Sequence, residues 1–259
     1  MPSTFEQLRD IERRELDRFE TYLQGLDADG WLEQSYDTDW RVYDVVSHVA
    51  SQSVIYLGFL ATWFEGSPPM AQEQMQAVWD KFNALEASAM LPEFRKAKAD
   101  YLVRIGALPG EAGQKEIESF LGKAKAETML ALRLHEVALH SWDIYVARDR
   151  RATLPADVVN QLLPIQLLMR GRRKPAALDG KRVHLRATDQ PWQQLIDFRA
   201  EKPAVQEGSA DGADLTLEGP AEELCRVLAG RHHVPGSSPA LNRHGASAQD
   251  LAALSVFAG

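Results

Sequence analysis

Four ionisable side chains recur at helical spacing within residues 129–146, and two of them have the chemistry to bind a divalent cation. Arg133, Glu136, His140 and Asp143 follow one another at steps of three, four and three residues, which places them on one face of a helix. Glu136 and His140 lie one turn apart, so a carboxylate and an imidazole can converge on one ion. A catalytic zinc ion takes about three protein ligands and keeps one position open. The spacing therefore predicts part of a metal site.

The third ligand must come from another part of the chain, and His48 is the candidate. It lies in the middle of a predicted helix, on a face that also carries Val45 and Ile55. His135 is less suitable, because it points about 100° away from its neighbour Glu136 around the helix. We therefore predict a metal site formed by His48, Glu136 and His140.

The same residues also have simpler interpretations. Glu136 and His140 suit an ordinary intrahelical pair, His48 suits a hydrogen-bonded core histidine, and Arg133 and Asp143 suit salt-bridge partners. Apolar residues surround the helix that carries four of these groups, so it should be largely buried. Burying an ionisable group costs several kcal/mol unless a partner or a metal compensates for it. The buried charges of the polar face therefore need either ion-pair partners or a metal, and the sequence alone does not decide between the two.

The elements that must position these residues are helices. Apolar residues recur at helical spacing in four stretches of the first half, at residues 4–26, 40–64, 71–105 and 117–147. Pro92 predicts a break or kink in the third stretch. Four helices with short connections favour a four-helix bundle.

Strand periodicity appears only after residue 150. Apolar and polar residues alternate at 182–187 and 213–218, and 194–199 is a weaker strand candidate. We expect helices at 155–169, 220–230 and 248–257, and a loop at 231–245. The predicted fold class is α + α/β, with a helical domain at residues 1–150 and a small α/β domain at residues 151–259.

Composition limits the function classes. The 259 residues are 45% hydrophobic and 25% charged, which is typical of a globular protein, and the net charge of −8 argues against a general nucleic-acid scaffold. The single cysteine, Cys225, excludes an internal disulfide and a CxxC redox pair. Residues 1–150 carry 16 basic and 25 acidic side chains, whereas residues 151–259 carry 13 and 12. This change in charge coincides with the predicted domain boundary.

The sequence shows no obvious secretory leader or membrane segment. The first 14 residues are polar, and the most apolar stretch, residues 53–64, is too short to span a bilayer. We expect a cytoplasmic protein that acts on a small molecule and has neither a membrane nor a nucleic-acid partner.

Two segments resemble the signature helices of the mycothiol-dependent maleylpyruvate isomerase family, which belongs to the wider DinB-like metalloenzyme group. Residues 40–48 follow the pattern W-x-V-x-D-V-x-x-H, and residues 133–143 follow R-x-x-E-x-x-x-H-x-x-D. Residues 215–231 are similar to the small C-terminal domain of that family, which resembles sterol-carrier-protein modules. Residues 71–114 and 232–246 match no pattern of the family, so the substrate stays open.

The resemblance implies a DinB-like four-helix bundle that presents His48, Glu136 and His140 to a divalent cation, usually zinc. It also implies that the open metal position receives the thiol of mycothiol or another low-molecular-weight thiol. A metal-bound thiol is deprotonated at neutral pH, and the thiolate is the nucleophile. Addition of the thiolate to a cis double bond, rotation and elimination would give the trans isomer, whereas release of the adduct would be an S-transfer.

The resemblance further implies a role for Arg231, whose side chain would hold a substrate carboxylate. Arg231 equally suits a cap for the helix that precedes it. We therefore expect an enzyme, either an isomerase or an S-transferase, that depends on a metal and a thiol. A non-catalytic DinB-like module that binds a metal or a small molecule is the alternative, and a structural protein with an internal ion-pair network is a third class.

Overall fold

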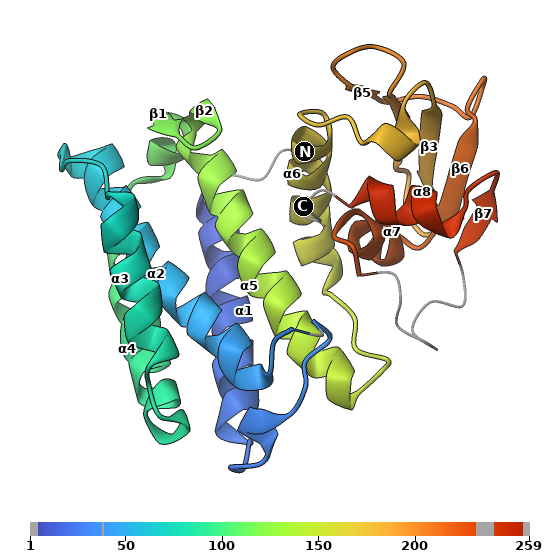
Figure 1. Cartoon of the computed structure of the whole chain (residues 1–259). Coiled ribbons are helices and arrows are strands. Elements are labelled where there is room, and N and C mark those ends of the chain that lie inside the picture. Colours follow the sequence, from blue (N-terminus) through green and yellow to red (C-terminus); the bar gives the residue numbers. More distant parts are fainter. Residues whose placement is uncertain (1–4, 38, 232–240, 256–259) are drawn as a thin grey trace. The chain divides into compact units, whose positions relative to one another are not determined.

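The computed structural model describes residues 5–37, 39–231 and 241–255, and the chain divides into two compact units. Met1–Asp149 is mainly helical, whereas Arg150–Gly259 combines helices with a sheet (Figure 1). The prediction of a mixed helical and sheet chain is thereby confirmed.

Four long helices build the first unit. They are α1 (Phe5–Gln24), α2 (Val42–Glu65), α4 (Ala87–Gly106) and α5 (Ala126–Arg148). Each of α1 and α2 packs against both α4 and α5, and α3 (Gln72–Asn83) packs against α2. Aromatic rings fill the core, as in the edge-to-face contact of Phe19 with Phe94 at 5.6 Å between ring centroids. The 3-10 helices Gly30–Leu32 and Gly110–Gln114 lie in the connections.

Local signals set the ends of α2 and α5, which carry the predicted ligands. The Asp44 carboxylate accepts a hydrogen bond from the Arg41 backbone N–H at 2.9 Å and so caps the start of α2. Gly66 ends α2 with a φ of 76°, a conformation that costs glycine little. Arg148 lies in the last turn of α5, where the negative end of the helix dipole stabilises a positive charge.

The third predicted helix is wrong in its extent, because the structure breaks it after Asn83 into α3 and α4. Pro92 does not end a helix and lies inside α4. The hydroxyl group of Tyr43 on α2 lies at this break, where it contacts the carbonyl oxygens of Phe82 at 3.2 Å and of Leu85. These contacts attach the α3–α4 connection to α2.

The start of the fourth predicted helix is also wrong. Residues 117–125 belong to an antiparallel hairpin of β1 (Glu116–Ser119) and β2 (Gly122–Lys125), and α5 begins directly after it. Gly122 in the turn has a φ of 79°, which a helix does not allow. The helical periodicity of the sequence extended further than the helix does.

Among the described residues, α2 is the one helix long and apolar enough to cross a membrane by length and composition, with a mean hydropathy of 1.3. Helix α2 is longer than residues 53–64, the apolar stretch that was expected to be too short to span a bilayer. However, α2 packs against α3, α4 and α5, and Val45, Val46 and Val49 are fully buried. Such packing is typical of the core helix of a folded domain.

The second unit is built around a five-stranded sheet. Its strands are β3 (Arg182–Ala187), β4 (Gln193–Asp197), β5 (Ala204–Gln206), β6 (Leu215–Gly219) and β7 (Asn242–His244). The strand order is β5-β4-β3-β6-β7, in which β3 and β6 are parallel and the other pairs antiparallel. The helices are α6 (Ala156–Arg170), α7 (Ala221–Leu228) and α8 (Ala248–Leu254), and a 3-10 helix spans Ala176–Leu178. Helix α7 packs on β3 and β6.

The strand predictions for this unit agree with β3, β4 and β6, but β5 and β7 were missed. Strand β7 lies in the segment predicted as a loop, of which residues 232–240 fall outside the described residues. Both missed strands have three residues and lie at the edges of the sheet, so neither shows a readable alternation. Strand β6 shows it, since Leu215 and Leu217 are buried and Thr216 between them is half-buried, whereas in β3 the polar His184 is buried together with Val183 and Leu185.

Candidate metal centre

The structure brings His48, Glu136 and His140 together. His48 Nε2 lies 3.1 Å from Glu136 Oε2, and His140 Nε2 lies 3.5 Å from the same oxygen. One ligand atom from each residue lies within 4.8 Å of the other two. The three side chains are 23%, 25% and 14% exposed, so the cluster is sheltered but accessible. His135 is only 2% exposed, and its Nδ1 lies 3.8 Å from the other Glu136 oxygen.

This donor set fits a divalent cation of zinc type. Two imidazole nitrogens and one carboxylate oxygen are common zinc ligands, at about 2.0–2.1 Å from the metal. Two ligand atoms at tetrahedral positions around such an ion are about 3.3 Å apart, by the same bond lengths. The distances of 3.1 and 3.5 Å to Glu136 Oε2 lie on either side of that value.

Asp143 orients His140. Its Oδ2 lies 3.1 Å from His140 Nδ1, and its side chain is fully buried. The carboxylate has only acceptors, so Nδ1 carries the proton that it shares with Asp143, and Nε2 is directed at Glu136. A histidine that ligates a metal through one nitrogen commonly donates the other N–H to a carboxylate in this way.

Trp40, just before α2, contacts both imidazoles. Its ring centroid lies 5.0 Å from that of His48 and 5.5 Å from that of His140, and the second pair is stacked at 28°. These contacts restrict rotation of both rings. The sequence pattern of residues 40–48 contains Trp40 but does not by itself indicate this role.

Gln52 is a second residue of the site that was not among the predicted ones. It lies one turn after His48 on α2, and its Nε2 is 3.0 Å from Glu136 Oε2 and 2.8 Å from His48 Nε2. Its Oε1 accepts a hydrogen bond from Arg133 Nη1 at 3.1 Å. The spacing of four residues from His48 is the signal that places Gln52 on the same face.

Arg133 lies deeper in the unit and is fully buried. Its Nη2 donates to the Val49 carbonyl at 3.0 Å and to Ser53 Oγ at 2.8 Å, and its Nε lies 3.6 Å from Glu12 Oε1. Glu12 on α1 also accepts a hydrogen bond from the Tyr101 hydroxyl group at 2.9 Å. Arg133 therefore connects α5 to α1 and α2, as its position on the predicted polar face requires.

The charges of the cluster are strongly coupled. Burial disfavours ionised Glu136, but the neighbouring imidazoles of His135, His140 and His48 outweigh it and hold its pKa well below the ordinary value. Burial also opposes charge on His140, yet Asp143 and Glu136 raise its pKa to about 9. Burial lowers the pKa of His48 despite its contact with Glu136. A cation that took these ligand atoms would displace a proton, since metal ligands must be deprotonated.

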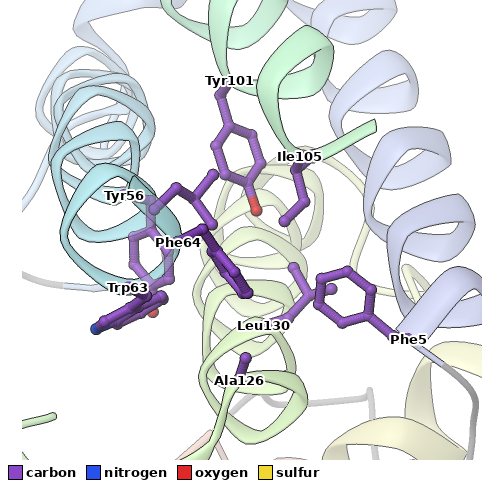
Figure 2. Close-up of a pocket in the computed structure, with 9 residues that line it drawn as sticks. Phe5, Tyr56, Trp63, Phe64, Tyr101, Ile105, Ala126 and Leu130 are labelled. Carbon is purple, nitrogen blue, oxygen red and sulfur yellow. The ribbon is translucent and has the colours of Figure 1, made fainter. Parts of the chain in front are cut away.

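An apolar pocket lies elsewhere in the helical unit (Figure 2). Its lining is aromatic or aliphatic: Phe5, Tyr56, Leu60, Trp63, Phe64, Tyr101, Ile105, Ala126 and Leu130. The rings of Tyr56 and Tyr101 also contact the Arg133 guanidinium group, with its Cζ 5.7 and 5.8 Å from their centroids. Because this lining includes none of the three clustered residues, the pocket is distinct from the metal centre.

Arg231 lies in the second unit, directly after Gly230, which has a φ of 78°. Its Nη1 donates to the Ala229 carbonyl at 2.9 Å, and its backbone N–H donates to the Arg226 carbonyl at 2.8 Å. These contacts place Arg231 at the C-terminal end of α7, as the helix-capping interpretation expects. Its role toward a substrate stays a prediction.

Comparisons with known proteins relate the chain to one family. The family model of the mycothiol maleylpyruvate isomerase N-terminal domain matches residues 13–145, more than half of the chain. A crystal structure of the mycothiol-dependent maleylpyruvate isomerase is similar, with a TM-score of 0.69 and 16% identity over 95% of both chains. The structure of a histidine-to-alanine mutant of that isomerase gives the same values. At this identity the likeness concerns the fold. No curated protein matches the sequence.

Proposed function

Because the chain belongs to the mycothiol maleylpyruvate isomerase family, we propose that it is a divalent-metal-dependent enzyme that uses a low-molecular-weight thiol of the mycothiol type. Its proposed reaction is the cis–trans isomerisation of a small molecule similar to maleylpyruvate. The observation that carries this proposal is the convergence of His48, Glu136 and His140 from α2 and α5 on one point. Zinc is the proposed metal, because two imidazoles and a carboxylate suit it.

The side chains of the site have separate tasks in this proposal. His48, Glu136 and His140 hold the cation, Asp143 keeps the His140 proton on Nδ1, and Trp40 limits rotation of the imidazoles. A bound cation would keep a thiol deprotonated, and reversible addition of that thiolate to a cis double bond allows rotation with no net change in atoms. The partial exposure of the three ligands leaves room for the thiol and the substrate to approach.

The proposed domain identities follow the same family. We propose that the first unit is a DinB-like metal-binding four-helix bundle and the second a small α/β domain of the sterol-carrier-protein type. The mutual packing of α1, α2, α4 and α5 supports the first assignment, and the five-stranded sheet covered by α7 supports the second.

Arg231 is proposed to hold a carboxylate of the substrate. A guanidinium group is suited to this task, because it forms paired hydrogen bonds with a carboxylate. S-transfer to an electrophilic small molecule is the second proposed reaction of the same site. A cytoplasmic location, with its reduced pool of thiols, fits both reactions.

A thiol-dependence assay tests the proposed function. The purified chain is incubated with Zn²⁺, a cis-enoic acid such as maleylpyruvate, and mycothiol, glutathione or no thiol, and the product is identified by NMR. We expect conversion to the trans isomer only with a thiol, and loss of activity with a chelator. A thioether adduct would assign S-transfer instead. Absence of both products with every thiol, or equal conversion without a thiol, would contradict the proposal.

Two variants complete the assay. His140→Ala should abolish conversion, because it removes a proposed ligand. His244→Ala is the matched control, since His244 is exposed on β7 and should leave conversion unchanged.

A further inference from the structure

We propose that Gln52 is a positioning residue of the metal centre: Arg133 fixes the orientation of its amide, and the amide fixes the Glu136 carboxylate as a ligand. This inference rests on the proposed function to the extent that His48, Glu136 and His140 bind a cation. It assigns a task to a side chain that has no place in the ligand set itself.

Arg133 is the rigid part of this arrangement. It is fully buried, and two acceptors on α2, the Val49 carbonyl and Ser53 Oγ, hold its Nη2. Glu12 Oε1 lies 3.6 Å from Arg133 Nε. The rings of Tyr56 and Tyr101 contact the guanidinium group as well. A planar group with this many neighbours has little freedom to move.

The fixed guanidinium group determines which way the Gln52 amide faces. Arginine has only donors, so the atom of Gln52 that meets Nη1 at 3.1 Å must be the carbonyl oxygen Oε1. The opposite orientation would bring two donor groups together. The Gln52 NH₂ group must therefore point to the other side, where Glu136 Oε2 lies at 3.0 Å and His48 Nε2 at 2.8 Å.

Of these two atoms, Glu136 Oε2 is the acceptor of Gln52 in the proposed metal-bound site, because the single lone pair of His48 Nε2 would bind the cation. This donor orients the carboxylate. Each carboxylate oxygen has two lone-pair sites. When Gln52 occupies one site on Oε2, the carboxylate group cannot rotate freely, and the second site stays directed toward His48 and His140, which lie at 3.1 and 3.5 Å. Outer partners of this kind commonly change metal affinity by 10–100-fold when they are removed.

Metal binding without any substrate tests the role of Gln52. The dissociation constant of Zn²⁺ is measured by competition with a chromophoric chelator, and the absorption spectrum of bound Co²⁺ reports the coordination geometry. Gln52→Met keeps the length of the side chain but removes the donor. We expect it to raise the Zn²⁺ dissociation constant by about 10–100-fold and to change the Co²⁺ spectrum. Gln76→Met on α3 is the matched control, because Gln76 is exposed and contacts only Asp80 among the described pairs; it should change neither readout.

A double-mutant cycle tests whether Arg133 acts through Gln52. Arg133→Lys keeps the charge but loses the planar fork, so it should also weaken Zn²⁺ binding. If Arg133 acts through Gln52, the double variant with Gln52→Met binds Zn²⁺ no more weakly than Gln52→Met alone. Ser53→Ala, which removes one acceptor of Arg133, gives the same test if Arg133→Lys does not fold. Thermal unfolding of the metal-free variants shows which of them are folded.

The outcomes separate this inference from the proposed function. A wild-type chain that binds neither Zn²⁺ nor Co²⁺ would contradict the metal centre and with it both proposals. Wild-type binding that Gln52→Met leaves unchanged would overturn the role of Gln52 alone. Additive losses in the double variant would overturn the dependence of Gln52 on Arg133.

Discussion

Asp143 lies one turn after His140 on α5, and its buried carboxylate holds His140 Nδ1 at 3.1 Å. We predict that Asp143→Asn weakens Zn²⁺ binding by about 10–100-fold. The asparagine amide can donate to Nδ1, and this moves the ring proton to Nε2, where the metal should bind. The measurement is the Zn²⁺ dissociation constant by calorimetry, with the exposed Asp10→Asn as a control. An unchanged constant would show that Asp143 does not set the tautomer.

Glu12 should make the stability of the chain depend on pH. Burial raises the pKa of its carboxyl group from 4.5 to about 7, although Arg133 and Tyr101 act in the opposite direction. The folded chain therefore holds a proton that the unfolded chain releases between pH 4.5 and 7. The stability that this proton contributes is complete below pH 4.5 and is lost as the pH rises through 7.

Glu12→Gln removes this titration. Between pH 5 and 8 we expect the wild type to lose about 2–3 kcal/mol of unfolding free energy relative to Glu12→Gln. Denaturant unfolding with a chelator present measures the difference, and Glu73→Gln on the exposed face of α3 is the control. A difference that stays constant over this pH range would contradict the buried, neutral carboxyl group.

Tyr43 should contribute to stability without affecting the metal centre. Its hydroxyl group contacts carbonyl oxygens at the α3–α4 connection. Tyr43→Phe removes this donor and should lower the unfolding free energy by about 1 kcal/mol. The Zn²⁺ dissociation constant should stay the same, because the hydroxyl group contacts none of the ligands. A weaker affinity in this variant would show that the α3–α4 connection acts on the metal site.

A substitution of Arg231 distinguishes a role in substrate binding from a role in helix capping. If its guanidinium group holds a substrate carboxylate, Arg231→Met should raise KM by about 10–100-fold, the value of a lost hydrogen bond to a charged group. Steady-state kinetics with the cis-enoic acid measure this change, and Arg243→Met on the exposed strand β7 is the control. An unchanged KM with a lower unfolding temperature would assign Arg231 to the end of α7 alone.

The three proposed ligands could be named from the sequence, because helical spacing places each of them on a helix face. Glu136 and His140 are one helical turn apart, and His48 has apolar neighbours at helical spacing, so each side chain could be placed on a helix face. The family resemblance read from residues 40–48 and 133–143 is confirmed by the family model that matches residues 13–145. The structure then places the three side chains together.

The role of Gln52 was not predictable, because it depends on a contact between distant segments. Gln52 has a fixed orientation only because Arg133, 81 positions away, meets its carbonyl oxygen. The α3–α4 connection likewise contacts Tyr43, which lies about 40 positions earlier on α2. Local periodicity carries no information about such partners. The hairpin before α5 did have a local signal, since Gly122 at the start of β2 interrupts the helical pattern.

Metal content tests the central claim most directly. The wild-type chain, purified without chelators, is analysed by inductively coupled plasma mass spectrometry beside His140→Ala and the control His244→Ala. We predict close to one divalent ion, mainly zinc, per wild-type chain and per His244→Ala chain, and almost none in folded His140→Ala. A folded wild type that holds no divalent metal and binds none on addition of Zn²⁺ would contradict the metal centre of His48, Glu136 and His140.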